Sequence, residues 1–179
     1  MTNPPRSERP SMEGYGVTDD PDGLLPWSWA EERLLTCRNF WFVTARPDGR
    51  PHSMPVWGAW MPERQRWGFG CAPTSQKVRN LATNPNVVIT VEDTVEAISI
   101  EGVAERIDGD AAGPFITAWV DKYASEVGDF ADGIDDASRE QAAEFLRGGA
   151  MFEVVPRRAI GMIERAEEFS TAATRWVWG

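Results

Sequence analysis

Histidine, cysteine and long apolar runs are scarce in this sequence of 179 residues. His52 is the one histidine, and Cys37 and Cys71 are the two cysteines. A zinc site and a histidine-based catalytic triad are therefore not expected, and two separated cysteines exclude a disulfide scaffold or a CxxC redox site. No apolar run approaches the roughly 20 residues of a membrane helix, and the N-terminus lacks the apolar core of a signal peptide. We expect a cytoplasmic protein with no membrane span and no metal site.

Basic residues are also in deficit, since 18 Lys and Arg stand against 28 Asp and Glu, for a formal net charge of -10. Nonspecific nucleic-acid binding usually requires a basic face and is not expected. A local cluster of cations is correspondingly more informative in such a chain. The 42% hydrophobic content and nine tryptophans indicate a packed globule.

The chain is predicted to consist of a flexible N-terminal arm, residues 1–26, and a single domain, residues 27–179. The arm is dense in Pro, Gly, Ser and Asp and has few large apolar residues. Ser28 is expected to cap a helix that runs to about Cys37.

A hairpin is the clearest local prediction. The aromatic and β-branched run Phe40–Ala45 predicts a strand, and Asp48-Gly49 predicts the turn to a second strand from Arg50 to Trp60. Pro51 and Pro55 cannot donate ladder hydrogen bonds, so this second strand should be an edge or be interrupted there.

Further strands are predicted at 66–71, 87–91, 97–107, 151–155, 159–163 and 174–178. Helices are predicted at 75–83 and within a helical insertion at about 110–147. Six or seven strands with few helices favour a mainly β fold, a small antiparallel barrel with peripheral helices.

The segment from Gly68 to Pro85 passes from strand to loop to helix, with Thr74 or Ser75 as the expected N-cap. Val78, Leu81 and Ala82 form the packing stripe, which leaves Lys77, Arg79 and Asn80 off it. Two cations near free backbone N–H groups favour an anion, most simply a phosphate monoester or diester. The segment is not a P-loop, and Gly68-Phe-Gly70 does not support a dinucleotide fold.

The stretches TARPDGRPHSMPVWGAW, TSQKVRNLATNP, VVITVED and ISIEGVAERI together resemble the pyridoxamine 5'-phosphate oxidase-like split β-barrel superfamily. The similarity is strongest over residues 28–107 and points to the branch of flavin/deazaflavin oxidoreductases that use cofactor F420. The resemblance implies an FMN-binding-like split barrel, a homodimer, and a cofactor groove between the protomers.

The resemblance also implies which residues hold the cofactor. Gln76 stands where pyridoxamine-phosphate oxidases place arginine before the lysine, and their long basic substrate signature is absent, which favours F420 over FMN. The implied cofactor-binding residues are those of the phosphate segment, Ser75, Gln76, Lys77, Arg79 and Asn80; those beside the ring system, Pro55, Val56 and Trp57; and those that approach by their backbone, Gly70, Cys71 and Ala72.

The expected function is an F420-dependent oxidoreductase that transfers hydride to an unknown small organic substrate. The alternatives are an FMN-binding oxidoreductase of the same fold and a non-catalytic protein that binds or stores flavin, F420 or haem. No catalytic acid or base can be assigned from the sequence. His52 is read as a strand residue facing solvent or the groove edge, with contact to substrate or cofactor as the alternative. One of Trp57 and Trp60 is expected in the core, and the tryptophan-rich tail is expected at an interface or near the cofactor.

Overall fold

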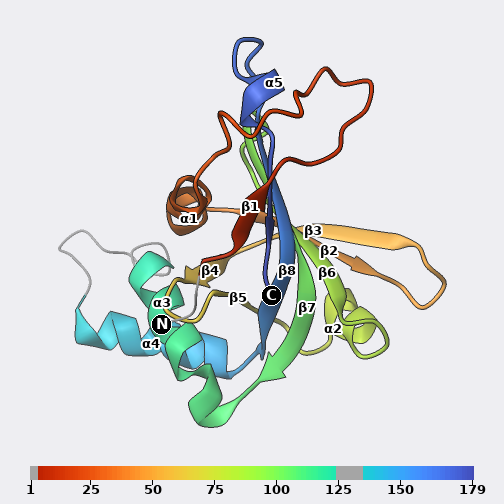
Figure 1. Ribbon diagram of the computed structural model, residues 1–179. Coiled ribbons are helices and arrows are strands. Elements are labelled where there is room, and N and C mark those ends of the chain that lie inside the picture. The colour runs from red at the N-terminus through yellow and green to blue at the C-terminus, as the bar shows by residue number, and fades with distance from the viewer. Residues whose placement is uncertain (1–3, 124–134) are drawn as a thin grey trace.

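The computed structural model describes residues 4–123 and 135–179 (Figure 1). Its strands are β1 Arg6–Glu8, β2 Phe40–Ala45, β3 Pro51–Val56, β4 Gly58–Met61, β5 Arg66–Cys71, β6 Asn86–Val91, β7 Glu96–Ile107, β8 Ala150–Ile163 and β9 Thr174–Val177. Its helices are α1 Trp27–Thr36, α2 Gln76–Leu81, the 3-10 turn Gly109–Ala112, α3 Gly113–Tyr123, α4 Asp136–Arg147 and α5 Phe169–Ala172.

A closed antiparallel barrel forms the centre of the molecule. The sheet runs in the order β1-β9-β8-β7-β6-β2-β3, and β4 pairs with β5, which pairs with β8. Only Trp57 separates β3 from β4, so this bent segment connects the edge at β3 to β5, and the pairing of β5 with β8 closes the ring. The prediction of a mainly β barrel with peripheral helices is confirmed, and β3 is the edge strand that its two prolines indicated.

β8 is one strand of 14 residues, so the prediction of two late strands was wrong. Its first half pairs with β5 and its second half with β9, while β7 pairs along its whole length. The register shifts between Glu101 and Gly102, opposite Pro156. A Cβ at Gly102 would lie 2.5 Å from the Val155 carbonyl oxygen, so this bulge requires glycine.

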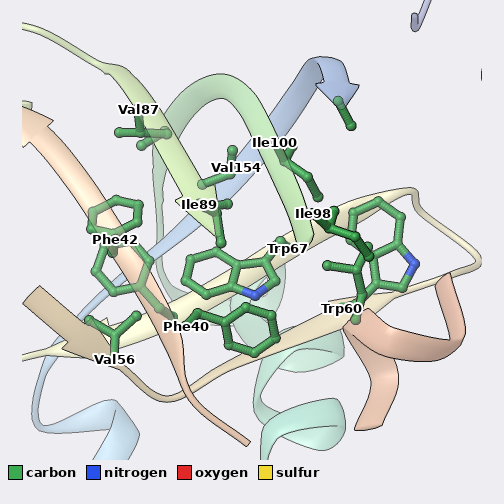
Figure 2. Close-up of a cluster of buried hydrophobic side chains, with 14 of the residues drawn as sticks. Phe40, Phe42, Val56, Trp60, Trp67, Val87, Ile89, Ile98, Ile100 and Val154 are labelled. Atoms are coloured by element: carbon green, nitrogen blue, oxygen red, sulfur yellow. The ribbon is translucent and has the colours of Figure 1, made fainter. Parts of the chain in front are cut away.

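Aromatic rings fill the barrel (Figure 2). Trp67 is fully buried, and its ring stacks on Phe42 with centroids 5.8 Å apart and packs edge-on against Phe40 at 5.3 Å. Truncating a ring of this kind costs about 3–5 kcal/mol, because burial and packing are both lost. Figure 2 shows Ile89 and Val154 next to the same ring, from two other strands, and Ile98 beside Trp60.

The helices lie outside the barrel, with α1 and the α3–α4 pair on one side and α2 beside the β2–β3 hairpin (Figure 1). Residues of α3 and α4 form a second apolar cluster with Ala59, Met61 and Met151. The helix α1 starts at Trp27 with Pro26 as its N-cap, so Ser28 is not the cap. The rest of the predicted helical insertion, 124–134, lies outside the described residues. None of the described helices is long and apolar enough to cross a membrane.

The segment predicted as a flexible arm carries a strand that the sequence analysis did not find. β1 pairs with β9, and the Arg9 guanidinium donates to the carbonyl oxygens of Thr171 and Ala173. The tail packs in the chain's own core, since Trp176 is fully buried and its ring lies 5.5 Å from that of Trp27.

Candidate functional site

The helix α2, which follows β5, is hydrogen-bonded to the β2–β3 hairpin through one buried side-chain amide. The Asn80 side chain is fully buried, and its Nδ2 donates to Thr44 Oγ1 at 2.8 Å. Its Oδ1 accepts from Gln76 Nε2 at 2.7 Å. The prediction that Asn80 lies off the packing stripe was therefore wrong, because Asn80 anchors α2 to β2.

Ser75 is the N-cap of α2, but its side chain makes no capping hydrogen bond. Its hydroxyl donates instead to Cys71 Sγ at 3.4 Å. α2 has only six residues, so the field of the helix itself adds little, and the positive potential at this end of the molecule comes from side chains.

Lys77 and Arg46, which we call the cation cluster, supply that positive potential. Within residues 4–123 and 135–179, neither side chain makes a hydrogen bond or ion pair, and both act electrostatically on His52. Arg79 is different, since its guanidinium donates to the Thr74 carbonyl oxygen and to Gln76 Oε1. In a chain with a formal net charge of -10, two unpaired cations that act on the same histidine favour an anionic ligand.

His52 lies on β3, directly opposite Thr44, within the electrostatic reach of both cations. Burial lowers the pKa of its imidazole, and the charges of Arg46 and Lys77 lower it further. Its Nδ1 is buried and has no hydrogen-bond partner in the described part of the chain. The sequence suggested His52 only as a possible contact.

The inward face of the hairpin continues past the barrel. Alternate residues of a strand share a face, so His52, Met54 and Val56 point the same way. Val56 is buried in the barrel, whereas Met54 is 45% exposed although it lies opposite buried Phe42. Met54 thus adds an apolar surface on the face of the hairpin that carries His52. The sequence analysis did not select Met54, although the alternation of inward and outward residues along β3 could have identified it.

Trp57 is held at the bend between β3 and β4 by groups from outside the sheet. Its ring stacks on Tyr123 at 5.1 Å and 4°, and the Arg38 guanidinium lies 5.3 Å from its centroid. Tyr123 Oη and Lys122 Nζ both donate to the Gly58 carbonyl oxygen. Trp60 is the member of the pair that enters the core, with 2% exposure.

Three further residues were predicted to contact the cofactor: Pro55, Gly70 and Ala72. Pro55 is exposed and lies opposite Trp41 on the outward face of the hairpin. Ala72 is exposed after the end of β5. A Cβ at Gly70 would lie 2.7 Å from Leu146 Cδ2, so the close neighbour at this glycine is α4.

Two cavities have walls that include neither Lys77 nor Arg46. One, of about 680 Å³, lies over the outward face of the sheet, where Val43, Ala45 and Val88 are ringed by arginines and glutamates. The other, of about 800 Å³, lies between α1, β4 and α3. The described residues hold no group of three His, Cys, Asp or Glu placed to bind a metal ion.

Residues 29–147, which include the hairpin, α2 and both flanking strands, match the model of the family described as pyridoxamine 5'-phosphate oxidase. The chain belongs to the pyridoxamine 5'-phosphate oxidase family. Its mainly β sheet with peripheral helices is the split barrel of this family. No curated protein is similar enough in sequence to count as a match.

Solved structures of similar fold carry three different cofactor names. An F420 reductase is 25% identical over 72% of this chain and 94% of its own, with a TM-score of 0.50. A pyridoxamine 5'-phosphate oxidase-related, FMN binding protein from Nostoc punctiforme is 16% identical over 89% and 100%, with a TM-score of 0.57. A heme binding protein from Mycobacterium smegmatis is 17% identical over 83% of this chain and 62% of its own, with a TM-score of 0.55. The last two likenesses show the fold alone.

Proposed function

We propose that this protein is an F420-dependent oxidoreductase that transfers hydride to a small organic substrate. The observation that carries the proposal is the cation cluster: Lys77 on α2 and Arg46 at the end of β2 have no carboxylate partner in the part of the chain that the structure describes. When bound, the deazaflavin supplies the hydride chemistry. The chain's own residues would hold the phosphate and keep the ring beside Met54, on the inward face of the hairpin.

The charge of the site favours F420 over FMN. Gln76 is neutral, and its amide is already engaged by Arg79 and Asn80, so it adds no charge to the cation cluster. FMN carries a phosphate monoester with nearly two negative charges at neutral pH, whereas the phosphate of F420 is a diester with one. Compared with a site that has arginine in the place of Gln76, this site carries one cation fewer, and the diester likewise carries about one negative charge fewer than the monoester.

We also propose a homodimer whose interface includes the outward face of β2. Trp41 is 47% exposed there, in line with Val43 and Ala45, which line the 680 Å³ cavity. The rim of that cavity alternates in charge, with Arg158 bonded to Glu101 at 2.8 Å. A two-fold axis would bring such a mixed rim into register with its own copy.

FMN-dependent oxidoreduction and non-catalytic binding of flavin, F420 or haem are the alternatives. A haem protein needs an axial ligand, and His52 is the only histidine that could serve. Its imidazole, whose pKa is lowered and whose Nδ1 has no hydrogen-bond partner in residues 4–123 and 135–179, is the specific observation that favours this alternative.

Titration of the purified protein with F420, FMN and haem, followed by absorption and calorimetry, tests these readings. We expect F420 to bind most tightly and Lys77→Ala to weaken it by about 10–100-fold, the value of one charge-assisted hydrogen bond. Arg50→Ala is the control, because Arg50 is a cation in the hairpin turn that follows Arg46 but pairs with Asp48 at 2.7 Å. Tight FMN binding without F420 affinity would refute the proposal, and turnover of reduced F420 with an acceptor would exclude a storage role.

A further inference from the structure

His52 lies on the same face of the hairpin as α2, where an anion bound at the cation cluster would interact with its imidazole. The register of β2 and β3 sets it opposite Thr44, whose hydroxyl accepts from Asn80 of α2. The imidazole therefore stands on the face of the hairpin against which α2 is fastened. Figure 1 shows α2 beside this hairpin, outside the barrel.

All the unpaired charge around His52 is positive among the residues that the structure describes. Arg46 acts on it from the end of β2 and Lys77 from α2. Asp48 and Arg50 in the hairpin turn neutralise each other. Arg79 on α2 is bonded to neutral oxygens. No carboxylate on these elements is free to stabilise an imidazolium.

The imidazole ring of His52 also has a nitrogen that is not hydrogen-bonded within the described residues. Its Nδ1 is buried without a hydrogen-bond partner, which costs free energy unless a partner is supplied. An anion close to Arg46 and Lys77 would supply negative charge where the histidine lacks it.

We propose that His52 is a further ligand of the phosphate group and takes up one proton from solvent when that group binds beside Arg46 and Lys77. This inference rests on the proposed function, because it assumes that a phosphate-bearing cofactor occupies the cation cluster. The neutral imidazole then becomes an imidazolium that donates to a phosphate oxygen, and the positive charge of the site rises from two to three only when the anion is present.

Proton uptake makes binding depend on pH in a defined direction. The bound anion raises the pKa of His52, so affinity increases as pH falls through the interval between the pKa values of the free and bound forms. Each unit by which the anion raises that pKa corresponds to a tenfold change in affinity between the two limits. A monoester dianion should raise the pKa of His52 further than a diester monoanion, so FMN and F420 give different slopes.

The test uses the fact that the chain has a single histidine, whose imidazole NMR signals need no assignment. The His52 resonance is titrated against pH in the full-length protein, first alone, then saturated with sulfate, with FMN and with F420. Sulfate is a tetrahedral dianion that keeps its charge across the titration, so any change of midpoint belongs to the histidine. We expect a higher midpoint with each anion that binds. An unchanged midpoint in a protein that has bound the anion overturns the inference.

Variants separate this inference from the proposed function. His52→Asn keeps an amide that can donate but cannot titrate, and His52→Gln is the second choice if the first variant fails to fold. We expect either variant to bind sulfate with an affinity that no longer varies with pH, whereas the wild type binds about tenfold more tightly at the acidic limit. If neither anion nor cofactor binds the wild type, or Lys77→Ala does not weaken binding, the proposed function fails. If they bind through Lys77 and His52→Asn keeps the wild-type pH dependence, only the role of His52 fails.

Discussion

Replacing Lys122 with methionine should change the stability of the protein in a pH-dependent way. Burial lowers the pKa of this lysine from 10.5 to about 8, although the nearby Cys37 and Glu92 act to raise it. Because the folded chain holds the proton less tightly than the unfolded chain, stability rises with pH between about 8 and 10.5. At neutral pH the buried charge therefore costs about 3 kcal/mol.

Favourable contacts offset part of this cost. Lys122 Nζ donates to the carbonyl oxygens of Leu34 and Gly58, both at 3.3 Å, and lies 4.8 Å from the ring centroid of Phe40. Nζ also lies 5.4 Å from the ring centroid of Tyr123. The two long hydrogen bonds and the two cation–π contacts contribute about 2 kcal/mol together. Lys122→Met keeps the apolar stem and removes both the charge and these contacts, so we expect a gain of about 1 kcal/mol at neutral pH.

Urea unfolding of the wild type and Lys122→Met, followed by tryptophan fluorescence, checks this expectation. Between about pH 7 and 9.5, the stability of the wild type should rise by about 2 kcal/mol relative to the variant, which reverses the sign of the difference. Lys77→Met is the control, because Lys77 is the only other lysine in the chain and should leave the wild-type dependence in place. A stability difference between wild type and Lys122→Met that stays constant over this range would refute the reasoning.

Two further predictions concern packing and assembly. Gly58→Ala should prevent folding or lower the stability by more than about 3 kcal/mol in thermal unfolding, because its Cβ would lie 2.1 Å from Trp67 Cζ2. Gly113→Ala is the control, because a Cβ there meets open space and should leave the stability nearly unchanged. Equal melting temperatures of the two variants would contradict this prediction. Trp41→Glu should convert the proposed dimer to a monomer in light scattering without loss of folded structure, since Trp41 is exposed on a single chain; an unchanged mass would remove Trp41 from the interface.

Local signals were enough to predict the hairpin. The strand Phe40–Ala45 has the predicted bounds, and Gly49 adopts a positive φ of 84° in the predicted turn. The break after Val56 could not be predicted in the same way. The break depends on Trp67, a residue of another strand. Its ring occupies the space that a side chain at position 58 would need.

The site was predictable on one side only. The sequence around Lys77 indicates an anion site by itself, but Arg46 and His52 join it through the register of the hairpin and the docking of α2. Asn80 illustrates the limit, because a polar residue on a short helix resembles a surface residue until its partner Thr44 is known. The strand Arg6–Glu8 is three residues long and carries no periodicity that could reveal it.

The pairing of β1 with β9 also constrains the order in which the protein folds. Arg6 lies opposite Val177, and Arg9 is held by carbonyl oxygens at positions 171 and 173. During synthesis, the N-terminal segment has no docking partner until residues 171–177 have left the ribosome. The barrel strands from β2 to β8 can pair before that moment, so β1 should be among the last strands to become ordered although it precedes them in the chain.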